Sequence, residues 1–330
     1  MEHTTLGRTG LPVSRLCMGT MTFGLQCDEP TSHAILDAAA EGGIDFLDAA
    51  DRYPLGGGLD TAGRTEEIVG RWLKGRRDQF VLATKCAGPM GPEPWNQGTS
   101  RKHVLDAIDA SLRRLDTDYV DLYQLHSYDP KTPLDESLDA LDRVVQSGKA
   151  RYVGVSNWMA HKVARALGRS EVKNLVRIDS VQPRYNLLFR SFERDLLPLC
   201  QEEGVAVIPY NPIAGGLLTG KHDRGSEPDP GTRFMLGTAA TMYQTRYWHD
   251  RAFDAVDALR PVAAEAGMSM TTMAVSWVLA NPAITAPIIG ASRPEQLADS
   301  LAAAEKPMDA DLKARLDEMT AEWRRDDAVR

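Results

Sequence analysis

Four polar side chains, each close to a short apolar run, could together deliver a proton to a carbonyl oxygen. Asp48 and Tyr53 lie in FLDAADRY, Lys85 ends FVLATK, and His126 ends YVDLYQLH. A phenol has a pKa of about 10, but a neighbouring ammonium lowers that pKa, and a carboxylate keeps the ammonium charged. A neutral imidazole can hydrogen-bond a carbonyl group. We therefore predict a general acid in which Asp48 pairs with Lys85 and Lys85 activates Tyr53.

Each of these residues has a simpler interpretation when it is taken alone. An aspartate at the end of a strand usually caps a turn, a lone lysine or histidine there is usually solvated or structural, and a loop tyrosine usually packs against its neighbours. The prediction depends on their order along the chain. Asp48, Lys85 and His126 end three consecutive predicted strands, and Tyr53 lies on the loop after the first.

The elements that must position these residues alternate along the chain. Eight short apolar runs, most of them rich in β-branched residues, are each followed by a helical stretch whose apolar residues recur every three or four positions. These runs cover residues 15–20, 45–50, 80–85, 119–126, 150–157, 180–186, 205–212 and 285–292. Alternating strands and helices predict a parallel α/β sheet, and eight units allow a closed (β/α)8 TIM barrel, in which active sites lie at the C-terminal ends of the strands.

The alternative architecture is an open doubly wound sheet. That fold usually carries a GxGxxG loop after its first strand, and MGTMTFG at residues 18–24 does not match it. No linker divides the chain, so we expect one domain over residues 1–330. A long irregular region at 214–250 is expected to serve function, because a loop of this length within a compact domain seldom lacks one.

Composition excludes several other classes of protein. The net charge of −8 argues against a nucleic-acid partner, because phosphate binding needs clustered lysine and arginine. The N-terminus has no apolar run typical of a signal peptide, and no stretch approaches the roughly 20 apolar residues of a membrane helix. The four cysteines form no CxxC pair, as is typical of a reducing compartment. We expect a cytoplasmic protein without a membrane segment, and composition leaves the oligomeric state open.

Blocks along nearly the whole chain resemble the aldo-keto reductases. They are LGRTGLPVSRLCMGT, FLDAADRY, RTEEIVGRWLKGRRDQFVLATK, YVDLYQLH, RYVGVSN, VQPRYNLL, IPYNPIAGGLLTGK and IIGASRPEQLADS. The resemblance implies a (β/α)8 barrel that reduces a small aldehyde or ketone with NADPH, NADH being the less favoured cofactor. It also implies that Tyr53 donates the proton, Lys85 activates it, Asp48 pairs with Lys85, and His126 orients the carbonyl.

The same resemblance implies a set of cofactor contacts. For the nicotinamide end the residues are Gly19, Thr20, Met21, Asp48, Ser156, Asn157, Gln182 and Tyr210, the last of these stacking on the ring. For the pyrophosphate they are Asn211, Pro212, Ile213, Gly215, Leu217 and Lys221, and the resemblance implies that the long loop around 214–250 covers the cofactor. For the adenosine phosphate and adenine they are Gly290, Ser292, Arg293, Gln296 and Ser300. A simpler interpretation of SRPEQ is a helix N-cap formed by Ser292.

Three positions depart from the family pattern. Asn211 stands where serine is frequent, Ser300 stands where asparagine usually contacts the adenine, and the run PLGGGLDTAGR after Tyr53 is longer than in many members. Residues that could line the substrate pocket are Met21, Phe23, Tyr53, Trp95, Tyr128 and Trp158.

Two other functions compete with carbonyl reduction. One is an NADP(H)-binding protein that reports redox state to a partner, as in the potassium-channel β-subunits; the presence of His126, which those relatives often lack, favours the reductase. The other is a metal-dependent barrel hydrolase, which needs several histidine and carboxylate ligands at strand ends. Only His126 occupies such a position among the seven histidines, so we expect no metal site.

Overall fold

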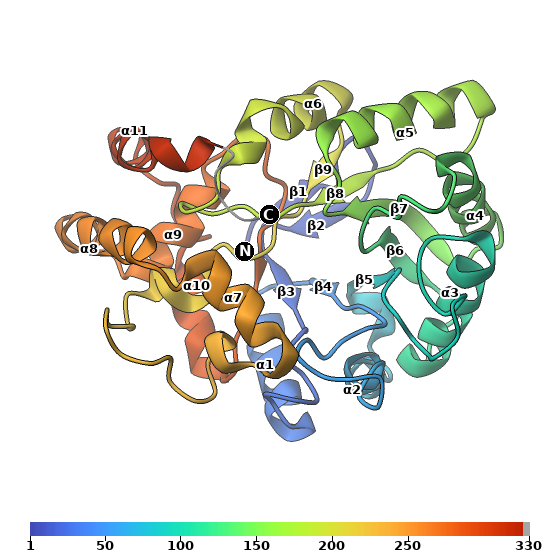
Figure 1. Ribbon diagram of the computed structural model, residues 1–330, viewed down its shortest axis with the longest axis horizontal. Helices are drawn as coiled ribbons and strands as arrows, with labels where there is room; N and C mark the ends of the chain where they lie inside the picture. The colour runs from blue at the N-terminus through green and yellow to red at the C-terminus, as the bar shows by residue number, and fades with distance from the viewer. Residues whose placement is uncertain (326–330) are drawn as a thin grey trace.

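The structure is a computed structural model that describes residues 1–325, and its centre is an eight-stranded parallel barrel (Figure 1). The strands follow the order β10-β3-β4-β5-β6-β7-β8-β9. Hydrogen bonds of 2.8 Å from Thr285 N to Val207 O and from Ile288 N to Pro209 O join the two ends of this sheet. The closed barrel is therefore confirmed, and the open doubly wound sheet is wrong. The strands are β3 (Cys17–Gly19), β4 (Phe46–Asp48), β5 (Val81–Cys86), β6 (Val120–Leu125), β7 (Ala150–Ser156), β8 (Ser180–Gln182), β9 (Ala206–Val207) and β10 (Ile288–Ile289).

Helices that follow the strands form an outer layer around the barrel. They are α1 (Glu29–Glu41), α2 (Arg64–Leu73), α3 (Arg101–Leu115), α4 (Leu134–Gln146), α5 (Ala160–Lys173), α6 (Leu196–Glu203), α8 (Asp250–Glu265) and α10 (Leu297–Ala302). Helix α3 shows why they form where they do. The side chain of Ser100 caps its first turn by accepting from His103 N, and Val104, Ile108 and Leu112 bury one face.

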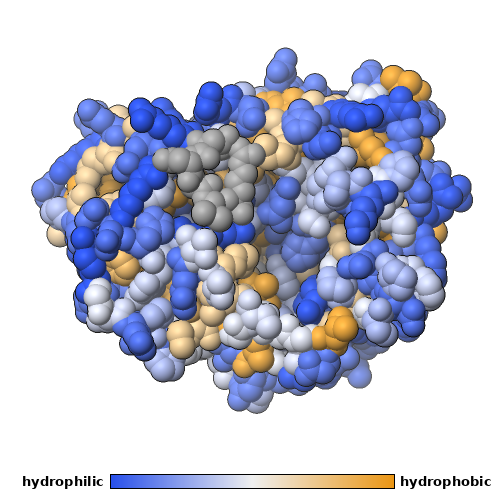
Figure 2. Space-filling model, viewed as in Figure 1, coloured by the Kyte–Doolittle hydropathy of each residue, from blue (hydrophilic) through white to orange (hydrophobic). Residues whose placement is uncertain are grey.

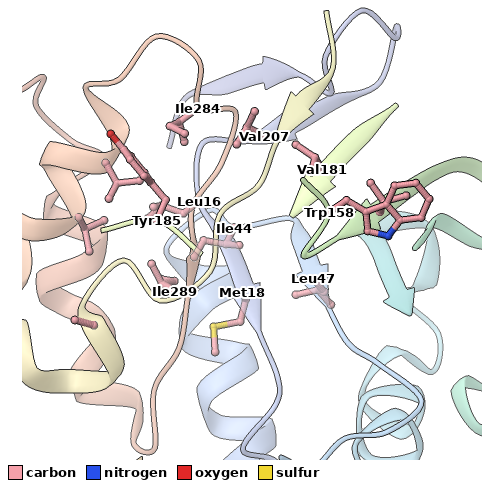
Figure 3. Close-up of a cluster of buried hydrophobic side chains, with 14 of the residues drawn as sticks. Leu16, Met18, Ile44, Leu47, Trp158, Val181, Tyr185, Val207, Ile284 and Ile289 are labelled. Atoms are coloured by element: carbon pink, nitrogen blue, oxygen red, sulfur yellow. The ribbon is translucent and has the colours of Figure 1, made fainter. Parts of the chain in front are cut away.

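Two hydrophobic layers hold the barrel together. Strand residues that point outward, among them Met18, Leu47 and Val181 (Figure 3), belong to a buried cluster that also contains many residues of the surrounding helices. Residues that point inward fill the barrel axis, and a hairpin of β1 (His3–Thr5) and β2 (Pro12–Ser14) closes one end. Leu6 and Val13 from this hairpin region join the inner layer. The sequence analysis did not predict the hairpin, whose strands are only three residues each.

Two helices that the sequence analysis also missed lack a clear amphipathic pattern. Helix α9 (Met270–Leu279) buries seven of its ten residues, and its largely apolar sequence has no single apolar face. Helix α11 (Ala310–Met319) buries only Leu316. It begins at Asp309, whose side chain accepts from two backbone N–H groups.

The segment expected to be irregular, residues 214–250, contains short helices. These are η3 (Ala214–Thr219), η4 (Arg233–Met235), η5 (Gly237–Ala239) and α7 (Ala240–Tyr247). Helix α7 contacts all three 3-10 helices. Thr238 N also donates to Gly56 O at 3.1 Å, which joins this segment to the long loop after Tyr53.

The remaining short helices are η1 (Arg77–Gln79), η2 (Ser191–Arg194), η6 (Pro294–Gln296) and η7 (Ala321–Arg324). Hydrophilic residues cover most of the face seen in Figure 2, and the hydrophobic ones lie in small separate groups. Among residues 1–325, no helix has both the length and the apolar character needed to cross a membrane.

Candidate active site

Alternation along the strands places polar groups inside the barrel, one layer above its apolar interior. Successive residues of a strand point to opposite faces, so residues two apart share a side. The inner apolar layer includes Phe46, Ala83 and Leu122. The residues two positions later on the same strands are Asp48, Lys85 and Gln124. The fold therefore brings these three polar side chains together near the C-terminal ends of β4, β5 and β6.

Lys85 lies at the centre of this polar layer. Its Nζ donates to Asp48 Oδ2 at 2.6 Å, to Ala49 O at 2.8 Å and to Tyr53 OH at 3.2 Å. The side chain is fully buried, so these three acceptors replace the water that an ammonium would otherwise bind. The structure thus joins Asp48, Lys85 and Tyr53 through direct contacts.

Two glutamines complete the surroundings of Asp48. Gln182 Nε2 donates to Asp48 Oδ1 at 2.9 Å, and Gln124 Nε2 donates to the same oxygen at 3.3 Å. The sequence analysis assigned Gln182 to the cofactor and did not select Gln124. Gln124 could have been selected from its position two residues before His126, because side chains two residues apart on a strand point to the same face.

The charges of this cluster follow from burial and from these contacts. Burial lowers the pKa of Lys85, but Asp48 and Tyr53 outweigh it, and the net pKa is raised. Burial raises the pKa of Tyr53, and Lys85 opposes that rise without cancelling it. We expected the pKa of Tyr53 to fall; it rises because the phenolate would be taken out of water. Tyr53 therefore stays protonated at neutral pH, as a proton donor must.

His126 lies next to Tyr53 and is uncharged. The two ring centroids are 5.7 Å apart in an edge-to-face arrangement. Burial, assisted by the positive charge of Lys85, lowers the pKa of His126 to about 3. A neutral imidazole carries one N–H donor, so His126 can hydrogen-bond a carbonyl oxygen between the rings without adding a second charge.

This lowered pKa predicts how stability depends on pH. In the unfolded chain His126 takes up a proton below about pH 6.5, whereas in the folded protein it stays neutral down to a pKa of about 3. Its contribution to stability is therefore complete above pH 6.5 and is lost as the pH falls towards 3. Between pH 7.5 and 5, we expect the wild type to lose about 1–2 kcal/mol more unfolding free energy than His126→Asn.

Urea denaturation of both proteins at the two pH values measures this difference directly. The two proteins differ only at position 126, so the difference between their losses isolates the effect of His126. Equal losses in the two proteins would contradict the low pKa of His126.

A chain of hydrogen bonds fixes the amide groups beside the cluster. Tyr210 OH donates to Asn157 Oδ1 at 2.7 Å. Asn157 Nδ2 in turn donates to His126 O at 3.0 Å and to Ser156 Oγ at 3.1 Å. Ser156 Oγ donates to Gln182 O at 2.9 Å. These contacts connect residues at or just beyond the C-terminal ends of β6, β7, β8 and β9.

Two adjoining cavities run from this cluster towards α10. The first, of about 240 Å³, contains Tyr53 and His126, and the second, of about 300 Å³, shares Ile213, Arg233, Gly290 and Ser300 with it. Most predicted cofactor residues line the first: Gly19, Thr20, Met21, Asp48, Ser156, Asn157, Gln182, Tyr210, Asn211, Pro212, Ile213, Gly290 and Ser300. The second is lined by Gly215, Lys221, Ser292, Arg293 and Gln296.

The two cavities suit a ligand with an aromatic amide at one end and phosphates at the other. The first offers the Tyr210 ring and several amide groups, which suit a neutral carboxamide. The second offers the cationic side chains Lys221 and Arg293, which suit phosphate oxygens. A nicotinamide dinucleotide has this distribution of groups, so the residues present fit one.

Some sequence-predicted residues lie elsewhere. The side chain of Leu217 lines neither cavity and is buried in the hydrophobic core. Of the residues proposed for the substrate pocket, Met21 and Tyr53 line the first cavity, but the other four do not. Phe23 is buried in the core, and Trp95 is 51% exposed. Tyr128 and Trp158 contact each other edge to face.

Ser292 does not act as the predicted helix N-cap. The N-cap residue of η6 is Arg293, and its side chain makes no capping hydrogen bond. Ser292 N and Ser292 Oγ instead donate to Gln296 Oε1 at 2.8 and 3.2 Å. The simpler interpretation of SRPEQ is therefore wrong, and Ser292 and Gln296 share one wall of the second cavity.

The sequence analysis did not predict several residues that line the first cavity, because they do not lie at the ends of strands. From segment 214–250 come Arg233, Met242, Tyr243 and Arg246, and from α9 comes Val275. The face of helix α7 that lines the cavity is set by the packing of the helix on η3, η4 and η5, which the sequence pattern does not show. The two arginines, in a segment rich in glycine, threonine and aspartate, were the only available signal.

Known proteins are similar to this chain over almost its entire length. A family model described as "Aldo/keto reductase family" matches residues 15–321. The chain is 38% identical to the uncharacterized oxidoreductase YrpG of Bacillus subtilis, over 97% of this chain and 96% of that protein. It is 36% identical to a probable voltage-gated potassium channel subunit beta of Arabidopsis thaliana, over 92% of both chains. It is 34% identical to L-glyceraldehyde 3-phosphate reductase of Escherichia coli O157:H7, over 92% of this chain and 87% of that enzyme.

Proposed function

Because the chain belongs to the aldo/keto reductase family, we propose that it reduces an aldehyde or ketone to the alcohol, with NADPH as the preferred cofactor. One observation carries this proposal above the others. The ammonium of Lys85 contacts Asp48 and Tyr53, and Tyr53 opens into the cavity that His126 also lines. That arrangement holds a protonated phenol where a carbonyl oxygen could accept its proton.

The roles of the protein groups follow from their charges. When bound, a nicotinamide cofactor would supply a hydride for the carbonyl carbon, and Tyr53 would donate its proton to the carbonyl oxygen. Lys85 stabilises the phenolate that remains, and Asp48 holds the Lys85 ammonium in place. The neutral imidazole of His126 donates a hydrogen bond to the same oxygen and orients it. Hydride and proton together account for the two hydrogens of the alcohol.

The cofactor would extend through both cavities. Tyr210 would stack on the nicotinamide, with Ser156, Asn157 and Gln182 near its carboxamide. Arg233 lines both cavities, so its guanidinium is available to the pyrophosphate between them. The adenosine phosphate would lie with Ser292, Arg293 and Gln296 in the second cavity, and Lys221, which lines the same cavity, would remain with the pyrophosphate.

Removal of Arg293 should weaken the binding of NADPH but leave the binding of NADH unchanged. Arg293 is exposed at the wall of the second cavity, so its bond to a phosphate is screened by solvent but is still charge-assisted. For Arg293→Ala we expect the Kd for NADPH to rise roughly tenfold, while the Kd for NADH, which lacks the extra phosphate, stays the same. Quenching of tryptophan fluorescence measures both constants.

Arg165→Ala is the matched control, because it removes an exposed arginine on α5, away from both cavities. Equal weakening of NADPH and NADH by Arg293→Ala would show that Arg293 does not select the extra phosphate.

The reductase proposal itself is tested by following NADPH oxidation by the purified protein. A panel of aliphatic, aromatic and sugar aldehydes, ketones and dicarbonyls covers the substrate classes that the family resemblance implies. Turnover of at least one class supports the proposal. Failure to bind NADPH would reject it.

A redox-sensing protein is the second candidate function. It is supported by the 36% identity to a protein named as a probable voltage-gated potassium channel subunit beta. Such a protein would bind NADP(H) tightly and turn over slowly. Multiple-turnover rates separate the two candidates: rapid turnover favours the reductase, and tight binding without turnover, with a stable partner recovered by affinity capture, favours the sensor.

A further inference from the structure

We propose that the carbonyl substrate carries an anionic group, and that Arg246 binds this group within the catalytic cavity. The inference rests on the proposed carbonyl reduction and deepens it by naming the class of substrate. Arg246 lies on α7 and lines the cavity that contains Tyr53 and His126, but it does not line the second cavity. Its charge is therefore available at the reacting end of the site.

Arg246 lacks the partners that other sheltered arginines of this protein have. The fully buried Arg190 forms ion pairs with Glu193 and Asp317, at 2.8 and 3.0 Å. The half-buried Arg114 pairs with Glu66 at 2.6 Å. Arg246 forms no ion pair with a carboxylate of residues 1–325, and its buried Nε has no hydrogen-bond partner there.

An unpaired guanidinium beside a cavity favours an anion that enters it. Taking a charge out of water costs free energy unless an opposite charge or hydrogen bonds compensate. Asp48 also lines the cavity, but it already bonds to Lys85. No free carboxylate among the described lining residues is left to neutralise Arg246, so a ligand carboxylate or phosphate would supply its partner.

The electrostatics of the neighbouring groups agree with this position. Burial raises the pKa of Tyr210 to about 12, and the positive charges of Arg246 and Arg184 oppose that rise. The charge of Arg246 also contributes to lowering the pKa of Arg184. Arg246 thus adds positive potential beside Tyr210, whose ring lies where the reacting end of the cofactor would stack.

Arg233 is less suited to this role, although it lines the same cavity. It also lines the second cavity, where the cofactor phosphates would lie. Its guanidinium is already 3.5 Å from both Asn211 Oδ1 and Tyr243 OH. Arg233 would therefore bind the cofactor phosphates, and Arg246 would bind the anionic group of the substrate.

The fold holds Arg246 in position before any ligand binds. Tyr243 and Tyr247 on the same helix are buried. Asn186 Nδ2 donates to Tyr247 OH at 3.1 Å, and Gln244 Nε2 donates to Phe234 O at 2.7 Å. Because α7 is anchored on both sides, binding an anion would not have to order the helix first.

Two aldehydes of nearly equal size test the inference. They are 4-carboxybenzaldehyde, which is anionic at pH 7, and methyl 4-formylbenzoate, its neutral ester. For the wild type we expect kcat/KM to favour the carboxylate at least tenfold. Loss of one partner from a buried charge pair typically weakens binding by at least about 30-fold. We therefore expect Arg246→Gln to lose about 30- to 100-fold on the carboxylate and less than about twofold on the ester. Arg246→Lys should keep part of the preference.

The control for a change in net charge is Arg165→Gln, on the exposed side of α5. It should leave the ratio of the two kcat/KM values at the wild-type level. D-glyceraldehyde 3-phosphate and D-glyceraldehyde form a second pair, which asks whether a phosphate is preferred to a carboxylate. A preference for either anion that disappears in Arg246→Gln supports the inference.

Three results would overturn it, and they have different meanings. If the wild type reduces charged and neutral aldehydes equally well, carbonyl reduction stands and the anionic substrate is rejected. If Arg246→Gln loses activity on both aldehydes equally and raises the Kd for NADPH, Arg246 serves the cofactor instead. If the wild type binds NADPH but reduces no carbonyl compound, the proposed reduction fails, and the substrate inference fails with it.

Discussion

Tyr53→Phe is expected to lower kcat by about 10²- to 10⁴-fold, the usual contribution of a general acid, while cofactor binding stays unchanged. The substitution removes one oxygen and keeps the ring. That ring packs against His126, with centroids 5.7 Å apart, and over the Lys85 ammonium at 4.8 Å. The packing therefore survives, and only the proton donor and its hydrogen bond from Lys85 are lost.

Single-turnover measurements with saturating NADPH would test this prediction, because they separate hydride transfer from release of the product. Tyr128→Phe is the matched control: it removes a tyrosine hydroxyl near the same rim, on a side chain that lines neither cavity. A general acid is expected to contribute at least about 10²-fold to the rate. If Tyr53→Phe kept more than about a third of the wild-type rate, Tyr53 could therefore not be the proton donor.

The contacts among Asp48, Lys85 and Tyr53 could be predicted from sequence because their signals are local. Each strand is marked by its own apolar run, and a barrel brings the C-terminal ends of its strands to one rim. Asp48 and Lys85, 37 positions apart, are therefore neighbours once the strands are recognised, and their Oδ2–Nζ distance is 2.6 Å. The direction of the Tyr53 pKa was mispredicted, because charge is readable from sequence whereas the burial that outweighs it is not.

The rest of the cavity depends on packing that no short pattern encodes. The largely apolar sequence of helix α9 has no single apolar face, so periodicity could not show that Val275 faces the first cavity. Helix α7 is only eight residues long and lies among 3-10 helices. The burial of Tyr243 and Tyr247 orients the helix so that Arg246 lines the cavity. The residues that bury these tyrosines come from distant parts of the chain. This part of the cavity lining therefore had to be read from the structure.

Lys85→Met is expected to lower both activity and stability, because the proposed proton transfer and the buried ion pair with Asp48 both depend on Lys85. We expect kcat to fall at least about 10²-fold, since the Tyr53 phenolate loses the ammonium that stabilises it. We also expect the unfolding free energy to fall by about 3–5 kcal/mol, because Asp48 becomes a buried carboxylate without its ionic partner. Asp48 is only 2% exposed, and the amides of Gln182 and Gln124 compensate only part of that charge.

The double variant Asp48→Asn/Lys85→Met separates the two effects. Removing both charges takes away the unpaired carboxylate, and replacing a buried ion pair by neutral groups is often nearly neutral for stability. We therefore expect urea denaturation to show the double variant recovering most of the lost unfolding free energy. Its kcat should remain as low as that of Lys85→Met, because neither variant can stabilise the phenolate. If stability stayed low in the double variant, Lys85 would act mainly through packing; if activity returned, Lys85 would not be needed to activate Tyr53.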